Sequence, residues 1–175
     1  MLLPFMITLF FGVVECSLAL ICRADVSIMA STTADLISQA DTLATGDISN
    51  VYNAAGTILY PYYDSSTAGS AKPTVRITSV IYDTSTQSTT AGKVAWTCTQ
   101  SGSGTLTPTS RATGSTLTLP QALLTSGNSV IVAEIAYNYA SPTTKVITGA
   151  INFTNNFYTK PRRVLQIPSP TGGCP

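Results

Sequence analysis

Residues able to perform chemistry at neutral pH are scarce in this sequence of 175 residues. It contains no histidine, which removes the usual general base, the Ser-His-Asp triad and nearly all catalytic zinc sites. Eight carboxylates remain: Glu15, Asp25, Asp35, Asp41, Asp47, Asp64, Asp83 and Glu134. No motif pairs two of them for acid–base catalysis, and no glycine-rich phosphate loop is present. We therefore expect a protein that is not an enzyme and that uses no metal or cofactor.

The four cysteines fall into two pairs with different prospects. Cys16 and Cys22 are six residues apart on a predicted helix and point in different directions, so they cannot bond to each other. Cys98 and Cys174 can pair, and a bridge would close a loop of roughly 75 residues and hold the tail Pro168–Pro175 on the domain. The alternative is two free thiols, with Cys98 buried beside Trp96. No CxxC spacing indicates metal or redox chemistry.

The N-terminal residues form an apolar run from Leu2 to Cys22 whose only charge is Glu15. As a helix this run is about 30 Å long, the thickness of a bilayer core, and its apolar residues outweigh the cost of one acid. A cleaved signal peptide would begin with basic residues, a lipoprotein would have small residues just before Cys22, and a soluble helix is rarely apolar all round. We predict a transmembrane helix over residues 1–22.

The orientation of this helix does not follow from its flanking charges. Arg23 and Asp25 follow the run and only the amino terminus precedes it, so the positive-inside rule does not decide. The cysteines and the composition, with 44% hydrophobic and only 10% charged residues, favour a domain outside the cytoplasm. A net charge of +1 provides no basic surface for nucleic acid.

Glu15 within the apolar run has two interpretations. It can be a protonated or partly hydrated carboxyl near the membrane interface. It can also mark a helix–helix contact, because an acid inside a membrane needs a partner and Gly12, three residues earlier, lets another helix approach the same face.

The remaining sequence predicts an α+β fold in which a long N-terminal transmembrane and stem helix and a second helix pack on an antiparallel sheet of about four strands. Helical periodicity continues from Val26 to Leu43 and ends at Gly46, so we expect a helical stem over residues 23–46. A domain over 47–175 follows. In it, Asp47 is the expected N-cap of a second helix that stops at Tyr60-Pro61.

Alternating apolar residues predict strands in the second half of the chain. They cover Val75–Tyr82, Lys93–Thr99, Ser129–Tyr139 and Val146–Tyr158, and a Ser/Thr/Gly-rich loop is expected over Gln100–Ser115. A short turn or helical piece is expected over Leu119–Leu124.

Glu134 is the one acid in the middle of a predicted strand, on the face opposite Ile131 and Ile135. There it can pair with Arg162 or Arg163, or it can be an exposed charge of little consequence for stability.

Four segments, in this order and spacing, resemble the TadE/TadG-like family of pilus assembly proteins. They are Leu3-Pro4 with the apolar run through Gly12-Val13-Val14-Glu15; Ala34-Asp35-Leu36-Ile37-Ser38-Gln39; Pro120-Gln121-Ala122-Leu123 before the strand Ile131–Tyr139; and Tyr158-Thr159-Lys160-Pro161-Arg162-Arg163. The resemblance implies a minor pseudopilin-like component of a tight-adherence (Flp, type IVc) pilus. It also implies a single-pass location in the bacterial inner membrane, with the C-terminal domain in the periplasm. The implied partners are the major pilin, other pilus assembly proteins and inner-membrane platform proteins, and the implied role is surface attachment.

The sequence departs from this family at its start. Related proteins have a basic leader and a glycine that a prepilin peptidase can cut, whereas Met1 here lies directly in the apolar run. Either such processing does not occur or the true start lies upstream.

A second functional hypothesis follows from the tyrosines. Tyr62, Tyr63, Tyr137 and Tyr139 can form a recognition surface, because tyrosine is enriched at interfaces. The chain would then be a membrane-tethered extracytoplasmic binding module similar to an adhesin.

Overall fold

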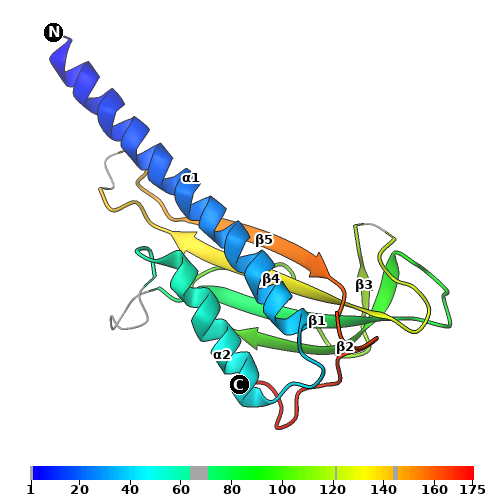
Figure 1. The fold of residues 1–175 in the computed structure, drawn as a ribbon. Helices are drawn as coiled ribbons and strands as arrows, with labels where there is room; N and C mark the ends of the chain where they lie inside the picture. The colour runs from blue at the N-terminus through cyan, green and yellow to red at the C-terminus, as the bar shows by residue number, and fades with distance from the viewer. Residues whose placement is uncertain (1, 64–70, 121, 144–145) are drawn as a thin grey trace.

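A computed structural model of the chain describes residues 2–63, 71–120, 122–143 and 146–175 and has the predicted α+β architecture (Figure 1). Two helices come first, α1 (Leu3–Ser38) and α2 (Thr45–Gly56), followed by a 3-10 turn (Thr57–Leu59). The described strands are β1 (Thr74–Tyr82), β2 (Ala91–Gln100), β3 (Thr116–Thr118), β4 (Ser129–Tyr139) and β5 (Ile151–Thr159). They form one antiparallel sheet of five strands, one more than expected.

Helix α1 is one continuous helix of 36 residues that crosses the boundary expected between residues 22 and 23. Pro4 suits its first turn, where a backbone N–H has no helical partner. The helix ends at Ser38, earlier than the predicted stem. The Arg162 N–H donates to the Ser38 carbonyl at 2.8 Å, so a distant segment takes one of the last helical acceptors. Leu43 lies in the loop after the helix, but its side chain is buried in the core. The apolar periodicity of the sequence therefore extends to Leu43 although the helix does not.

Helix α2 begins two residues before the expected N-cap. Asp47 is therefore not the cap but lies inside the first turn, where its carboxylate accepts the N–H of Ala44 at 2.9 Å. This contact satisfies a donor just before the helix and places a negative charge near the positive end of the helix dipole. Ile48, Tyr52 and Ala55 form the buried apolar stripe of α2, and the helical segment ends before Tyr60-Pro61 as expected.

The sheet has the strand order β3-β2-β1-β4-β5, with β1 at its centre. The predicted strand from Val146 begins only at Ile151, because the N–H groups of Val146 and Ile147 bond elsewhere. The additional strand, β3, follows the predicted loop and pairs with only three residues of β2, Ala91–Lys93. So short a strand offers too few alternating residues for a recognisable period.

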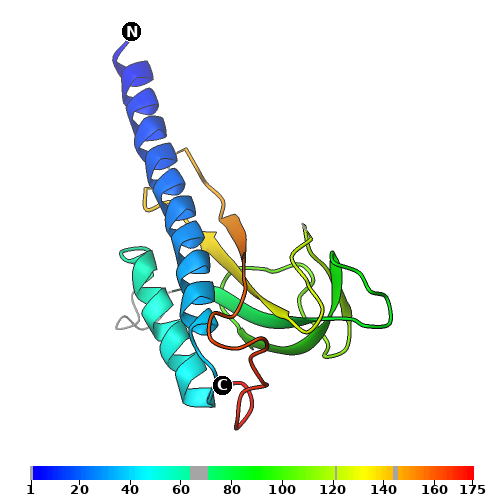
Figure 2. The same cartoon turned by 45° about the vertical axis from the view of Figure 1, so that its right-hand side comes forward.

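The two faces of the sheet are covered differently. Helices α1 and α2 lie side by side on one face, with α1 across β4 and β5 (Figure 2). Their core includes Met29, Ile37, Tyr52, Ile77 and Ile135. The other face has a smaller apolar cluster, in which Leu119 and Leu124 from the connection between β3 and β4 cover Val80, Val130 and Val132. Of the expected piece Leu119–Leu124, Gln121 lies outside the described residues.

The C-terminal tail is tied to the domain, as expected for the first of the two cysteine alternatives. Cys98 on β2 and Cys174 form a disulfide across 76 residues. The Trp96 indole donates to the Ile167 carbonyl at 2.9 Å, and the Thr171 N–H donates to the Leu43 carbonyl at 2.9 Å. The tail therefore joins β2 to the loop between the helices.

We predict that Cys174→Ser lowers the free energy of unfolding by about 4 kcal/mol, because the bridge restricts the unfolded chain over a long loop. Denaturant unfolding of the full chain in detergent, followed by Trp96 fluorescence, measures this change. Cys16→Ser is the matched control, because Cys16 is a free, exposed thiol. Equal stability of the two variants would contradict a stabilising bridge.

Candidate functional site: the N-terminal helix and the base of the domain

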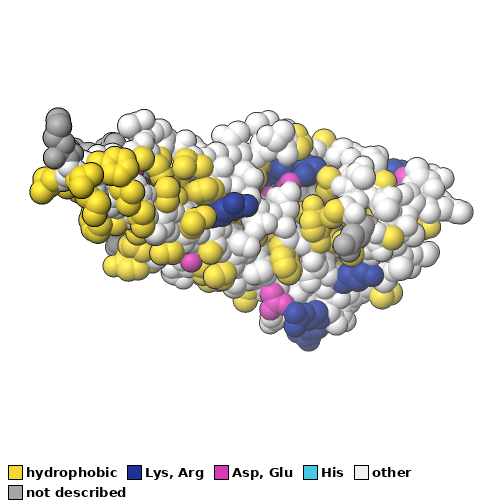
Figure 3. Space-filling model, turned by 90° about the horizontal axis from the view of Figure 1, so that it is seen from above, with side chains coloured by type: hydrophobic (Ala, Val, Ile, Leu, Met, Phe, Trp, Pro, Cys, Tyr) yellow, Lys and Arg dark blue, Asp and Glu magenta, His cyan; other side chains and the backbone are white. Residues whose placement is uncertain are grey.

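The first part of α1 extends beyond the rest of the chain and is apolar on all sides. Its first buried residue is Glu15, so the described residues before it are exposed or half-exposed. The exposed large apolar side chains in this part are Leu2, Leu3, Phe5, Met6, Ile7, Leu9, Phe10 and Val13. Figure 3 shows these hydrophobic side chains gathered at one end of the molecule. The whole helix is long and apolar enough to cross a membrane.

Glu15 is fully buried and is held by the chain's own β4–β5 connection. Its Oε2 accepts the N–H groups of Val146 at 3.0 Å and Ile147 at 2.5 Å, and the Thr143 hydroxyl donates to its Oε1. Charge-assisted hydrogen bonds of this kind offset the cost of burying a carboxylate. The predicted need for a partner is therefore met inside the subunit, by backbone groups that the sequence does not mark.

Gly12, on the same face of α1, is less covered than Glu15. It is half-buried, and a Cβ atom placed on it would lie 3.9 Å from Cγ2 of Val146, an ordinary contact distance. The face shared by Gly12 and Glu15 is thus covered at Glu15 and accessible toward the helix N-terminus.

Three of the four tyrosines proposed as a recognition surface gather where α1 meets the domain. The Tyr62 hydroxyl donates to the Leu18 carbonyl at 3.0 Å, and the Tyr137 hydroxyl donates to the Tyr62 carbonyl at 2.8 Å. The rings of Tyr62 and Tyr139 pack edge to face at 5.6 Å. Burial raises the pKa of Tyr137 to about 12, so its hydroxyl remains a donor at neutral pH.

A pocket opens beside these rings at what we call the base of the domain, the end nearest the exposed part of α1. Its volume is about 490 Å³. Its lining is mainly aromatic, proline and aliphatic and includes Leu18, Pro61, Tyr62, Tyr137, Tyr139 and Pro142.

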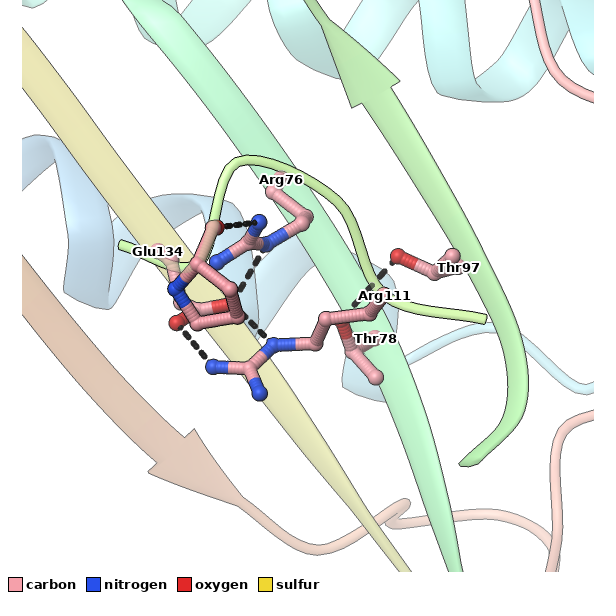
Figure 4. A network of polar contacts seen from close by, with 6 residues as sticks. Arg76, Thr78, Thr97, Arg111 and Glu134 are labelled. Carbon is pink, nitrogen blue, oxygen red and sulfur yellow. Dashed lines mark hydrogen bonds and ion pairs between the residues drawn. The ribbon is translucent and has the colours of Figure 1, made fainter. Parts of the chain in front are cut away.

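Glu134 lies on the opposite face of the sheet in a buried ionic network (Figure 4). Its Oε2 is 2.6 Å from Nε of Arg76, its cross-strand neighbour on β1, and its Oε1 is 2.6 Å from Nη2 of Arg111. Arg76 also donates to the Pro108 carbonyl at 2.6 Å. Burial raises the pKa of Glu134, but the hydrogen bonds and charges of Arg111 and Arg76 outweigh burial and hold that pKa below its ordinary value.

The predicted pairing of Glu134 with Arg162 or Arg163 is wrong. Arg162 pairs with Asp35, and Arg163 pairs with Asp41 at 3.3 Å. The chain after β5 passes to the helical side of the sheet, whereas the Glu134 side chain points to the other side, so these groups cannot meet. The alternative of an exposed charge is also wrong, because Glu134 is only 2% exposed.

The network holds a long loop against the central strands of the sheet. Arg111 and Pro108 come from the connection between β2 and β3, and both meet groups on the central strands. Thr78 and Thr97 share a hydrogen bond of 3.1 Å nearby, also between strands. No group of three possible metal ligands occurs among the described residues.

Comparisons with protein-family models, curated proteins and solved structures find no match for this chain.

We predict that Glu134→Gln lowers the free energy of unfolding by about 3–5 kcal/mol at pH 7, because two guanidinium groups lose their buried partner. The folded-state pKa of Glu134 lies below its unfolded value, so its contribution is present above the unfolded pKa and is lost as pH falls through the folded pKa. The difference between wild type and variant should therefore shrink below about pH 4.5.

Denaturant unfolding at a series of pH values measures this difference. Asp35→Asn is the matched control, because the Asp35–Arg162 pair is exposed and should contribute no more than about 1 kcal/mol. Equal losses in the two variants would contradict the assigned role of Glu134.

We predict that Glu15→Ala exposes the N–H groups of Val146 and Ile147 and raises their hydrogen-exchange rates at least about tenfold, because hydrogen bonds to charged groups contribute about 1.5–3 kcal/mol. Hydrogen-exchange mass spectrometry of the full chain in detergent measures these rates. In the control, Ser17→Ala, the lost hydroxyl donates to the Val13 carbonyl of its own helix. Unchanged exchange in Glu15→Ala would show that the carboxylate does not hold this connection.

Proposed function

We propose that this chain is a minor pseudopilin-like subunit that assists assembly of a tight-adherence (Flp) pilus and thereby surface attachment. It is anchored in the bacterial inner membrane by α1, with its C-terminal domain in the periplasm. The observation that carries the proposal is the division of α1 into an exposed apolar part before Glu15 and a part that forms the core of a domain. One helix of this kind can contact membrane partners and transmit the contact to the domain.

The residues that resemble the TadE/TadG-like family support the proposal by their arrangement. The segment Ala34–Gln39 ends α1, and Arg162 of the segment Tyr158–Arg163 meets it twice. The Arg162 guanidinium pairs with Asp35, and the Arg162 N–H donates to Ser38. Two segments separated by more than half of the chain thus form one junction, which gives both a structural reason to occur together.

The exposed part of α1 is the surface we assign to partners. A helix that is apolar all round and free of the domain fits other membrane helices, such as those of the major pilin, of other assembly proteins or of inner-membrane platform proteins. The disulfide agrees with a periplasmic domain, because disulfides persist in that oxidising compartment. We assign no catalytic role, since the ionic groups described above are engaged in holding the fold.

The adhesin-like alternative receives less support. An adhesin needs a recognition surface directed away from the membrane, whereas Tyr62, Tyr137 and Tyr139 contact α1 and one another near its exposed apolar part.

We predict that deleting the gene greatly reduces the number of surface pili and that a plasmid copy restores it. Normal pili and normal attachment in the deletion strain would contradict the proposal. Electron microscopy of negatively stained cells provides the count.

We further predict that Gly12→Ala reduces co-purification of the major pilin roughly threefold or more, because an added methyl group keeps a partner helix from close approach. The subunit itself tolerates this methyl group, which would make only an ordinary contact with Val146. Val13→Ala is the control on the same helix, since it only shortens an exposed side chain. Equal recovery of pilin with both variants would exclude a close contact at Gly12.

A further inference from the structure

The outer limit of the apolar surface on α1 lies beyond the point where the domain begins. After the first buried residues of α1, Leu20 is 64% exposed and Ile21 is 52% exposed, and Arg23 is the first exposed charged residue after them. A bilayer that covers Leu20 and Ile21 and leaves Arg23 in water has its outer boundary between these residues.

The base of the domain lies on the membrane side of this boundary. Leu18 precedes Arg23 by five positions, which corresponds to about 7 Å along the helix, and Glu15 by eight positions, or about 12 Å. Figures 1 and 2 both show the ends of α2 and β4 reaching the middle of α1, below its exposed end. An immersion of about 5–10 Å is typical of proteins that lie in the headgroup and upper acyl region.

The groups at this base suit such a position. Tyr60 is 69% exposed and Val146 is 46% exposed, an amphipathic ring and an apolar side chain of the kinds found at membrane interfaces. Of the carboxylates in the described residues, Glu15 lies at this depth; it is covered by backbone N–H groups and a hydroxyl and is fully buried.

The pocket beside Leu18 opens at this level. Its volume of about 490 Å³ lies in the range of small-molecule sites. Leu18, Pro61 and Pro142 line it together with the tyrosine rings, while the hydroxyls of Tyr62 and Tyr137 are turned to backbone carbonyls. The rings thus present mainly their apolar faces to the pocket, which is continuous with the lipid-facing surface of α1 through Leu18.

We propose that this pocket receives an acyl chain of a membrane lipid, so that the base of the domain is seated in the outer leaflet of the inner membrane. The inference rests on the proposed membrane anchoring of α1. It adds a lipid-binding site to that anchor and explains why aromatic residues from two separate segments lie beside α1 at this depth.

The test uses the full chain in vesicles of phosphatidylethanolamine and phosphatidylglycerol that contain a phospholipid with a diazirine on its acyl chain. After irradiation and proteolysis, mass spectrometry locates the labelled residues. We expect labels on 60–62 and 137–142 as well as on the exposed part of α1.

Ala140→Trp supplies the blocking variant, because Ala140 lines the pocket and is exposed, so a large side chain there fills the pocket without disturbing the core. Labelling of 60–62 and 137–142 should fall about tenfold, equivalent to about 1.4 kcal/mol of lost binding. Labelling of Phe5 and Phe10 should not change. Ala54→Trp, on the exposed side of α2, is the matched control and should label like wild type.

The outcomes separate the pocket from the anchor. Labels on Phe5 and Phe10 without labels at the pocket, or pocket labels that Ala140→Trp leaves unchanged, would overturn the lipid site while the anchor stands. Absence of labels from both regions would overturn the anchor and the site together. Native mass spectrometry that finds a bound peptide mass in place of a lipid mass would assign the pocket to a protein segment and also overturn the proposal.

Discussion

The burial of one carboxylate determines how the N-terminal helix meets the rest of the molecule. Glu15 lies in an apolar helix, where an unpaired charge would be very costly. The N–H groups of Val146 and Ile147 cover it, and these groups are consequently lost to the β4–β5 ladder, which begins only at Ile151. The same contact sets the point at which α1 leaves the domain. The contact at Glu15 is thus connected with the start of β5, with the exposed length of α1 and with the position of the base of the domain along α1.

The sheet beneath α1 resists distortion because both of its faces are secured, each by a different kind of interaction. The helical face is an apolar core to which α1, α2 and the central strands contribute. The opposite face has no described helix, and there the pairing of Glu134 with Arg76 and Arg111 holds the long loop across β1 and β4. The disulfide at Cys174 then fixes the tail near the loop that joins the helices. A rigid platform of this kind allows a force or contact on α1 to be carried to the whole domain.

Local pattern predicts much of this fold. The apolar run and the strands containing Val75, Trp96 and Ile135 follow from periodicity, because that signal depends on neighbours in the sequence. The sequence left the bridge between Cys98 and Cys174 open against two free thiols, and the structure contains the bridge. The partners of Glu134 do not follow, since Arg76 faces it only through the β1–β4 register and Arg111 comes from a loop without periodicity. Two of the partners of Glu15 are backbone N–H groups of Val146 and Ile147, which no residue type announces, and the Thr143 hydroxyl meets it only through the fold. The face of the sheet on which Glu134 lies was predictable, but its partners were not.

We propose that the apolar surface of α1 lies in the membrane up to Arg23 and that the domain beyond it is in the periplasm. Labelling of spheroplasts with a membrane-impermeant maleimide tests it directly, because Cys16 is a free thiol exposed on α1 and Ser27, further along, is also exposed. We expect Ser27→Cys to react from the periplasmic side and Cys16 to react only after detergent is added. Rapid labelling of Cys16 in intact membranes, or protection of Ser27→Cys until the membrane is dissolved, would contradict it.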